Sequence, residues 1–447
     1  MLQPITRSNG LRVILDPMPS AHSVSLNICI AAGSRYEQPA EAGVFHMIEH
    51  MLFKGTQNFS SKEIAEYQDD RGASVSAFTS KEYTCVYSRC LPEYASDMLT
   101  LMADMLRNCT LEPSDLANEK RVVFEEIAMY EDSPEDRVFD IFYEHVWPAH
   151  PLGGNILGTR STLQEMQHTL LKKLHHMFYT PERMVISVCG KIDNDAILTA
   201  IDEIFRVESW LPAQESAAVV SAPSAVFTPG FWHMNKDLDQ NQIVLAFPGL
   251  KARDPHRWHA ALLAGMLGEN SSSRLFMRLR EELALVYGVE FFNVHSSKEG
   301  ISGISMGTSE KNTVRAVSEA IKVLEAFPSS LTEKELRRTK EQAAASLVMS
   351  LESCGSRASR AGYQSLLFGD VYEVRESIDR YRSITIEEMR DFTAGFLLPP
   401  GKTALCIYGN CSRREESALA ELVHQEVTPL TEKQSRRHRH EESDRSA

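Results

Sequence analysis

Two histidines and a glutamate lie close together in the apolar segment between residues 43 and 53. They form the pattern His46-x-x-Glu49-His50. No proline interrupts the segment, so we expect a largely buried helix, on which residues three and four apart share a face. Both imidazoles would then face one point, which is the geometry that zinc requires of two ligands from one helical turn. The carboxylate of Glu49 could reach a metal-bound water and act as a general base.

The same order of residues is the inverzincin signature H-x-x-E-H. So short a pattern also arises by chance, and two satisfied helix histidines beside a solvated glutamate would then explain it. We favour the metal, because a charged glutamate on an apolar helix face is costly unless it is paired.

A second helix, expected from about residue 114 to 130, carries the candidate third ligand. Glu119 and Glu126 fall on one apolar face of it, whereas Glu125 points about 100° away from Glu126. We interpret Glu126 as the ligand and Glu119 as a partner that orients a ligand. The alternative is a helix edge with two solvated glutamates.

The pattern of apolar residues predicts the elements that position these side chains. Alternation and β-branched residues predict strands over residues 11–16, 24–30, 73–90 (one long run) and 240–247. Residues 61–71 are expected to form a short polar helix that ends at Gly72, and apolar residues at helical spacing predict another helix over residues 92–108. The acidic run at residues 131–136 is expected to be a loop.

Composition limits the class of protein. The chain has 447 residues, of which 43% are hydrophobic and 24% charged, as in a soluble globular protein of two to four domains. No apolar run could span a membrane, and the N-terminus lacks a signal-like core, so we expect a cytoplasmic protein. The eight cysteines are scattered without a C-x-x-C and are expected to be reduced core residues. A net charge of −14 argues against a nucleic-acid partner.

The two halves of the chain resemble each other, which predicts a duplicated α+β domain. Residues 111–120 resemble residues 331–340, and residues 178–190 resemble residues 396–409. The second copy lacks the candidate ligands. Residues 261–267 contain no His or Glu, and Ser346 stands opposite Glu126. We therefore expect one metal site per chain, in the first half.

Several of these stretches together resemble those of one enzyme family. They comprise residues 32–37 (AGSRYE), 43–56, 77–84 (AFTSKEYT), 119–126, 150–153 with 156–159, and 273–287. The sequence is similar to the pitrilysin (M16) family of zinc metallopeptidases over nearly its whole length. It most resembles the short bacterial members that are similar to the mitochondrial processing peptidase β subunit.

The resemblance implies the fold and its division into domains. The fold class would be α+β, with two duplicated α/β-sandwich domains of the M16 type, related to LuxS and processing peptidase, that form half of a clamshell. The zinc-binding catalytic domain would span residues 1–212, and a linker residues 213–230. An inactive, substrate-binding repeat would span residues 231–427. Residues 428–447 would be a charged, disordered tail.

The resemblance also assigns roles at the metal. His46, His50 and Glu126 would bind one Zn²⁺ per chain, Glu49 would be the general base, and Glu119 would support a ligand from behind. The interval between His50 and Glu126 is one residue shorter than is usual in the family, which a loop deletion explains.

Five further residues are implied to bind substrate. Ser76, Ala77 and Phe78 would form the edge strand onto which a peptide adds by backbone pairing. Ser76 replaces the asparagine that is common in the family. Arg280 and Tyr287 would hold the substrate from the second domain of a partner chain. Because one chain carries both the zinc set and this pair, we expect a homodimer.

The function implied is that of a zinc-dependent endopeptidase. It would hydrolyse peptides or unfolded, presequence-like segments inside a dimer chamber, without nucleic-acid or membrane partners. Two alternatives stay open. The chain could be a non-catalytic scaffold, or it could be a subunit that is active only with a different chain.

Overall fold

The computed structural model describes residues 2–206, 210, 224–425 and 427–430. Their contacts form two compact units, each assembled from three stretches of chain. The first unit comprises Met1–Ile127, Asn155–Ala222 and Val348–Val374. The second comprises Ala128–Gly154, Pro223–Leu347 and Arg375–Ala447. No helix in the described part of the chain is long and apolar enough to cross a lipid bilayer.

The first unit is built on a sheet that has six strands within the described residues, in the order β1-β2-β6-β3-β5-β4. The strands are β1 (Ile5–Thr6), β2 (Arg12–Pro17), β3 (Val24–Ile30), β4 (Ser74–Thr79), β5 (Thr84–Cys90) and β6 (Met184–Gly190). β2 and β6 are parallel, and the other neighbours are antiparallel. β4 lies at one edge of this sheet.

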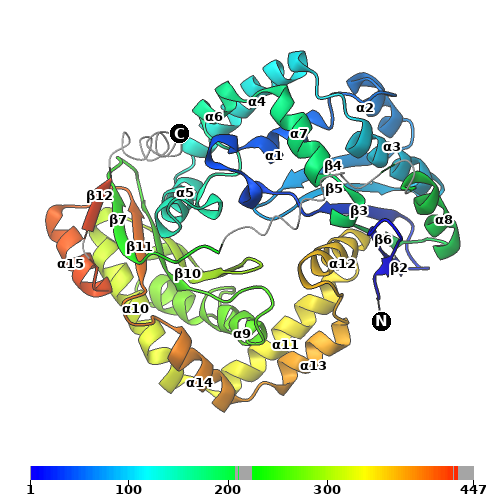
Figure 1. The fold of residues 1–447 in the computed structure, drawn as a ribbon. Helices are drawn as coiled ribbons and strands as arrows, with labels where there is room; N and C mark the ends of the chain where they lie inside the picture. The colour runs from blue at the N-terminus through cyan, green and yellow to red at the C-terminus, as the bar shows by residue number, and fades with distance from the viewer. Residues whose placement is uncertain (1, 207–209, 211–223, 426, 431–447) are drawn as a thin grey trace. The chain divides into compact units, whose positions relative to one another are not determined.

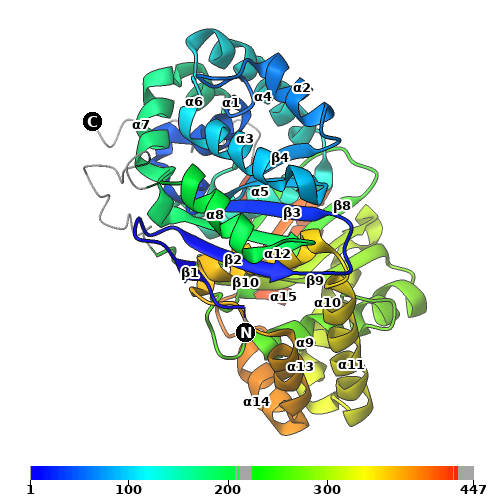
Figure 2. The ribbon, with the colours of Figure 1, turned by 90° about the vertical axis from the view of Figure 1, so that its right-hand side faces the viewer.

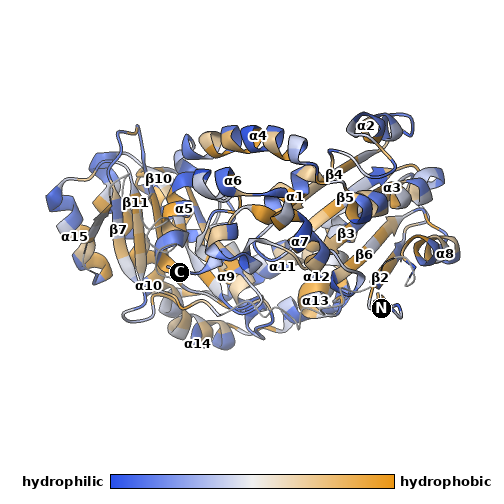
Figure 3. Ribbon diagram, turned by 45° about the horizontal axis from the view of Figure 1, so that its top comes forward, coloured by the Kyte–Doolittle hydropathy of each residue, from blue (hydrophilic) through white to orange (hydrophobic). Residues whose placement is uncertain are grey.

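Helices cover both faces of this sheet. They are α1 (Val44–Met51), α2 (Ser61–Asp69), α3 (Ala95–Asn108), α4 (Pro113–Glu131), α6 (Arg160–Glu165), α7 (His168–Phe178), α8 (Asn194–Ile204) and α12 (Cys354–Phe368). Alternate residues of β3, such as Leu26 and Ile28, enter the main core with α1, α3, α7 and α8. β3 and β6 are buried at every residue. Figure 3 shows them as mainly hydrophobic, in contrast to the more polar helix α2. Burial on both faces explains their nearly continuous apolar sequence.

The opposite face of the sheet is covered by α12, which comes from far along the sequence (Figures 1 and 2). Ile14 and Val185 contribute apolar side chains to this contact. Polar residues also take part: Asn27 of β3 donates a hydrogen bond to Ser359 at 2.9 Å. A Cβ added to Gly362 would lie 2.9 Å from Cys29 Sγ, so the close approach of α12 requires glycine. Arg357 donates two hydrogen bonds, of 2.5 and 2.6 Å, to the buried carboxylate of Asp16 in β2.

The second unit repeats this plan with a sheet of six strands among the residues described, in the order β12-β7-β11-β8-β10-β9. The strands are β7 (Gly230–Met234), β8 (Asn241–Pro248), β9 (Val286–His295), β10 (Gly300–Thr308), β11 (Ala404–Tyr408) and β12 (Val427–Leu430). The helices are α5 (Pro134–Val146), α9 (Arg257–Leu267), α10 (Thr313–Ser330), α11 (Glu333–Ser350), α13 (Val374–Ser383), α14 (Ile386–Phe396) and α15 (Arg413–Val423). Here α5, from early in the chain, packs beside β11 (Figure 1).

The two sheets confirm the predicted duplication. Taken in chain order, β2 to β6 and β7 to β11 occupy the same positions in their sheets. α4 and α11, which begin within the matching segments 111–120 and 331–340, are also equivalent. α9 takes the place of α1 and carries the apolar residues 261–267, and Ser346 lies exposed on α11.

Most of the predicted elements are confirmed, namely the strands at 11–16, 24–30 and 240–247 and the helices at 43–53, 61–71, 92–108 and 114–130. Two predictions are wrong. Residues 73–90 form a hairpin of β4 and β5 rather than one run, because Ser80 and Tyr83 close a turn between them. Residues 131–136 are not a loop: Glu131 ends α4, and Pro134 begins α5, where its fixed φ and missing N–H suit a first helical turn.

The contiguous domain boundaries also need correction. Residues 128–154 pack with the second unit and residues 348–374 with the first, because α5 and α12 each bury their apolar face on the sheet of the other half. Within the predicted linker, Gly230 already belongs to β7. The strand β12 (Val427–Leu430) begins at the last residue of the predicted repeat and extends into the predicted tail, where it lies beside β7. The remaining tail, from 431, and linker residues 213–223 lie outside the described residues. All eight cysteines are free thiols, as predicted.

The ion pair between Arg357 of α12 and Asp16 of β2 offers a test of the packing of α12 on the sheet of the first unit. Because Asp16 is buried, replacing Arg357 by Ala leaves a carboxylate without its charged donor and should destabilise the first unit by about 2 kcal/mol. Urea titration followed by hydrogen exchange in β2 measures this loss. As a control, Arg380→Ala removes an exposed pair with Glu376 and should cost well under about 1 kcal/mol. Equal effects of the two variants would contradict the role of Arg357.

Candidate metal centre

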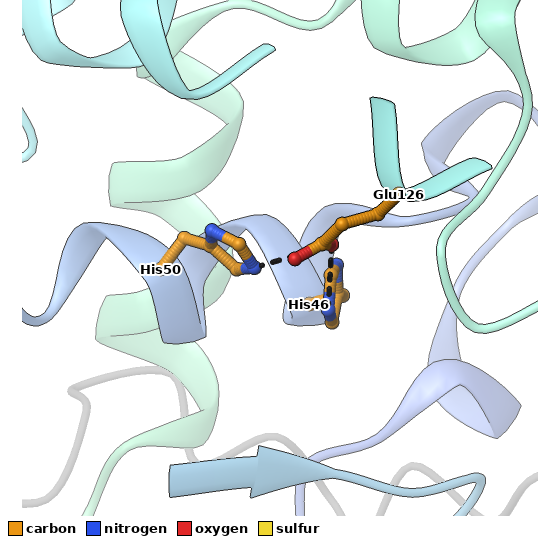
Figure 4. Close-up of side chains that lie close together, drawn as sticks. All are labelled: His46, His50 and Glu126. Carbon is orange, nitrogen blue, oxygen red and sulfur yellow. Dashed lines mark ion pairs between the residues drawn. The ribbon is translucent and has the colours of Figure 1, made fainter. Parts of the chain in front are cut away.

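His46, His50 and Glu126 converge on one point in the first unit. The two histidines project from α1, and Glu126 reaches between their rings from α4 (Figure 4). Glu126 Oε2 lies 3.8 Å from His46 Nε2 and 3.6 Å from His50 Nε2. The three potential ligand atoms all lie within 4.8 Å of one another. The third ligand predicted from the sequence is therefore brought to the other two.

The residues present fit a zinc ion. Glu126 Oε2 is buried and has no hydrogen-bond partner within the described chain, although a buried carboxylate oxygen requires one. The ligand atoms around a tetrahedral zinc lie about 3.3 Å from one another. The distances of 3.6 and 3.8 Å from Glu126 Oε2 to the two imidazole nitrogens are close to this value. Two imidazoles and a carboxylate are also a common donor set for catalytic zinc, with one position left open.

Electrostatics at His46 favour metal binding. Burial, with a smaller contribution from the neighbouring His50, lowers the pKa of His46 to about 3. The imidazole is therefore neutral over the physiological pH range, which is the form that coordinates a metal.

The first turn of α1 is held by groups outside the motif. The buried carboxylate of Glu37 accepts hydrogen bonds from the backbone N–H groups of Gly43 and Phe45, both at 3.0 Å. Burial raises the pKa of Glu37 to about 8, although these two amides lower it. Gly43 has a φ of +90°, and a Cβ there would lie 2.5 Å from the carbonyl oxygen of Leu157. Glycine is thus required where α1 begins.

Glu119 lies behind His50, on the same face of α4 as Glu126. Its Oε2 lies 3.1 Å from His50 Nδ1, and its Oε1 lies 2.7 Å from Lys54 Nζ. In the tautomer that donates from Nδ1, His50 presents Nε2 toward Glu126. The arrangement is that of a carboxylate that orients a metal-binding imidazole.

Glu49 is fixed by a residue of the edge strand. The hydroxyl of Thr79 in β4 donates a hydrogen bond of 2.6 Å to Glu49 Oε2, and the Thr79 backbone also hydrogen-bonds this carboxylate. Burial raises the pKa of Glu49, the Thr79 hydrogen bond opposes the rise, and the charge of Glu126 adds to it. A carboxylate with a raised pKa is suited to accept and return a proton.

β4 presents the three residues predicted to meet a peptide. Ser76, Ala77 and Phe78 pair with β5 on one side, and no other strand of the described chain pairs with their opposite side. Phe78 is 41% exposed, and its ring lies 5.6 Å from that of Tyr83. Backbone groups on this edge are thus available to another strand.

The hairpin that carries β4 is fixed to the segment before α1. Arg35, whose side chain is fully buried, forms an ion pair of 2.9 Å with Glu82 in the turn. A Cβ on Gly33 would lie 2.6 Å from the carbonyl oxygen of Ser80, so the segment can approach the turn only with glycine. The stretch of residues 32–37 thus positions both β4 and α1.

Arg280 and Tyr287 lie in the second unit and contact each other. Arg280 belongs to the π-helical segment η6 (Phe276–Glu282), and its Cζ lies 5.0 Å from the ring centre of Tyr287 at the start of β9. Tyr287 is 77% exposed. The predicted pair is therefore assembled and accessible, in a different unit from the metal-ligand cluster.

Three residues that matter for this geometry were missed from the sequence. Glu37 binds the N-terminus of α1, Lys54 contacts Glu119, and Thr79 contacts the candidate base Glu49. Only Lys54 left a signal, since it continues the four-residue spacing of His46 and His50. Nothing in the sequence places Glu37 or Thr79 beside α1.

Comparison with known proteins decides the family. Residues 12–160 match the family model described as insulinase (peptidase family M16), and residues 165–343 match that of the peptidase M16 inactive domain. The chain belongs to peptidase family M16. An uncharacterized zinc protease of Bacillus subtilis, YmxG, is 37% identical over 87% of this chain and 94% of its own length. One of Rickettsia bellii is 31% identical over 83% of this chain and 89% of its own.

Solved structures show the same M16 fold. A protease from Helicobacter pylori matches with a TM-score of 0.84 at 20% identity, over 91% of this chain and 99% of that one. A chain of Complex III2 from Candida albicans matches with a TM-score of 0.81 at 18% identity, over 96% of this chain and 100% of that one. The M16 family and the zinc proteases among its relatives imply a zinc peptidase at the level of the family.

The hydrogen bond from Thr79 predicts a specific kinetic defect in this M16 chain. Thr79→Val keeps the shape of the side chain but removes its hydroxyl hydrogen bond to Glu49, so kcat for peptide hydrolysis should fall about tenfold, the equivalent of one hydrogen bond to a charged group. KM and bound zinc should not change, and Thr79→Ser should restore the rate. Thr100, an exposed residue of α3, supplies the matched control Thr100→Val. A T79V enzyme with the parent kcat would contradict the prediction.

Proposed function

We propose that this chain is a zinc-dependent endopeptidase, with one zinc per chain held by His46, His50 and Glu126, and with Glu49 as the general base. The observation that carries the proposal is the convergence of the two imidazoles of His46 and His50 on a buried carboxylate oxygen of Glu126 that has no hydrogen-bond partner within the described chain. Glu49 lies on the same helix, one residue before His50, and is held by Thr79.

The residues of this chain would divide the work of hydrolysis. A bound zinc would supply Lewis-acid polarisation of the scissile carbonyl and a more acidic water. Glu49 would take the proton of the attacking water and return it to the leaving nitrogen, while the Thr79 hydroxyl holds its Oε2 in place. Glu119 keeps the His50 ring oriented throughout.

The substrate would be an extended peptide or an unfolded, presequence-like segment. Such a segment can add to the free edge of β4 at Ser76, Ala77 and Phe78 through backbone hydrogen bonds. Strand addition uses only backbone groups, so serine at position 76 is compatible with it. A folded protein surface could not supply this continuous backbone, which explains the preference for unfolded substrates.

The general base gives the first test. Glu49→Gln keeps the size and the hydrogen bond of the side chain but cannot take a proton, so cleavage of a quenched peptide library should fall at least about 100-fold. Zinc content, measured by atomic absorption, should stay at one per chain, whereas His50→Ala should lose the metal. Glu66→Gln, an exposed change on α2, is the control. Unchanged cleavage by the E49Q chain would refute the mechanism.

We also propose that the chain acts as a homodimer in the cytoplasm, with Arg280 and Tyr287 serving the site of the partner chain. The pair is assembled, and Tyr287 is exposed. One chain carries both the proposed zinc ligands and the pair of Arg280 and Tyr287, which favours self-association over dependence on a different subunit.

Mixing two inactive chains tests this arrangement. Glu49→Gln and Arg280→Ala chains are each expected to be slow alone. In a mixed dimer, the intact Glu49 of one chain meets the intact Arg280 of the other, so activity should return. No recovery in dimers whose mixing is verified by mass spectrometry would reject service of the partner's site. A zinc-loaded parent chain that cleaves only after a different subunit is added would instead favour the heterodimer.

A further inference from the structure

Lys54 lies against the side of Glu119 that faces away from His50. Its ammonium Nζ is 2.7 Å from Glu119 Oε1, while Glu119 Oε2 is 3.1 Å from His50 Nδ1. Each carboxylate oxygen thus has one partner. The Glu119 side chain is only 7% exposed, so water cannot readily replace either partner.

This burial makes the Lys54 contact more consequential than a surface ion pair. A buried carboxylate whose second oxygen loses its donor bears a desolvation cost, and it can reduce the cost by rotating toward another donor. Rotation would turn Oε2 away from His50 Nδ1. The imidazole would then lose the contact that sets its ring orientation and directs Nε2 toward Glu126.

The backbone places Lys54 for this contact. α1 ends at Met51, and the chain continues in a tight turn in which the N–H of Lys54 donates to the Met51 carbonyl at 3.2 Å. The turn holds the lysine stem at the end of the helix that carries both histidines. Lys54 thus links the end of α1 to Glu119 on α4, the helix that also carries Glu126.

We infer that Lys54 is a positioning residue of the metal centre: it holds Glu119 so that Glu119 orients His50, and it fixes α1 against α4 at the ligand cluster. The inference rests on the proposed zinc site. It assigns the order Lys54, Glu119, His50, metal, in which each group sets the orientation of the next.

Zinc affinity of the full-length chain, measured by competition with a chromophoric chelator, tests this order without any assay of activity. Lys54→Met keeps most of the aliphatic stem and removes the charge, and it should weaken zinc binding about tenfold. Lys54→Arg should bind nearly as tightly as the parent. Lys62→Met, at a lysine whose side chain is 82% exposed, should have no effect.

Coupling to Glu119 distinguishes positioning from general stabilisation. If Lys54 acts through Glu119, Lys54→Met should weaken zinc binding little further in a Glu119→Gln background. The visible spectrum of the cobalt-substituted K54M chain should also shift, because the ring of His50 moves. K54Q repeats the charge removal if K54M does not fold.

The outcomes separate this inference from the proposed function. If the parent chain binds no zinc, both fail. If the parent binds zinc and K54M binds it equally tightly, only the role of Lys54 fails. If the losses of zinc affinity caused by K54M and by E119Q add fully in the double variant, the order Lys54, Glu119, His50 is likewise overturned.

Discussion

The structure of the first unit depends on bringing a carboxylate of α4 between two imidazoles of α1. A buried helix that presents ring nitrogens on an apolar wall would be unfavourable by itself, because buried polar atoms require partners. Glu126 meets both rings, yet its Oε2 has no hydrogen bond in the described chain. A cation in this position would satisfy all three side chains at once and would link α1 to α4.

The same requirement explains the contacts around α1. Glu37 accepts hydrogen bonds from N–H groups at the start of α1. Lys54, just after the end of α1, forms an ion pair with Glu119, and Thr79 donates a hydrogen bond to Glu49. These three residues come from separate segments, and each binds a charged or polar group in or beside the candidate site. β4 would therefore have two roles in the proposed enzyme, since it carries both the hydroxyl that contacts Glu49 and the unpaired edge onto which a peptide could add.

Duplication and exchange of helices determine the rest of the architecture. Each sheet has its main core on one face and receives on the other a helix from the opposite half of the sequence, α12 in the first unit and α5 in the second. The receiving face of the first sheet bears small and polar residues, such as Asn27 and Cys29, which allow the close approach of Gly362. The second copy keeps the same order of strands without the candidate ligands, so His46, His50 and Glu126 are the one candidate metal cluster among the described residues.

The sequence alone determined what local periodicity encodes. The spacing of His46, Glu49 and His50 placed three polar groups on one helix face, and a heptad placed Glu119 and Glu126 together on another, because helix geometry follows from backbone hydrogen bonding. The tertiary structure decided which helices meet. The hairpin turn at Ser80, the partner of Glu37 and the destinations of α5 and α12 depend on contacts between distant segments. Periodicity within one element carries no information about such contacts, so only the folded chain showed that Thr79 contacts Glu49 and that Lys54 contacts Glu119.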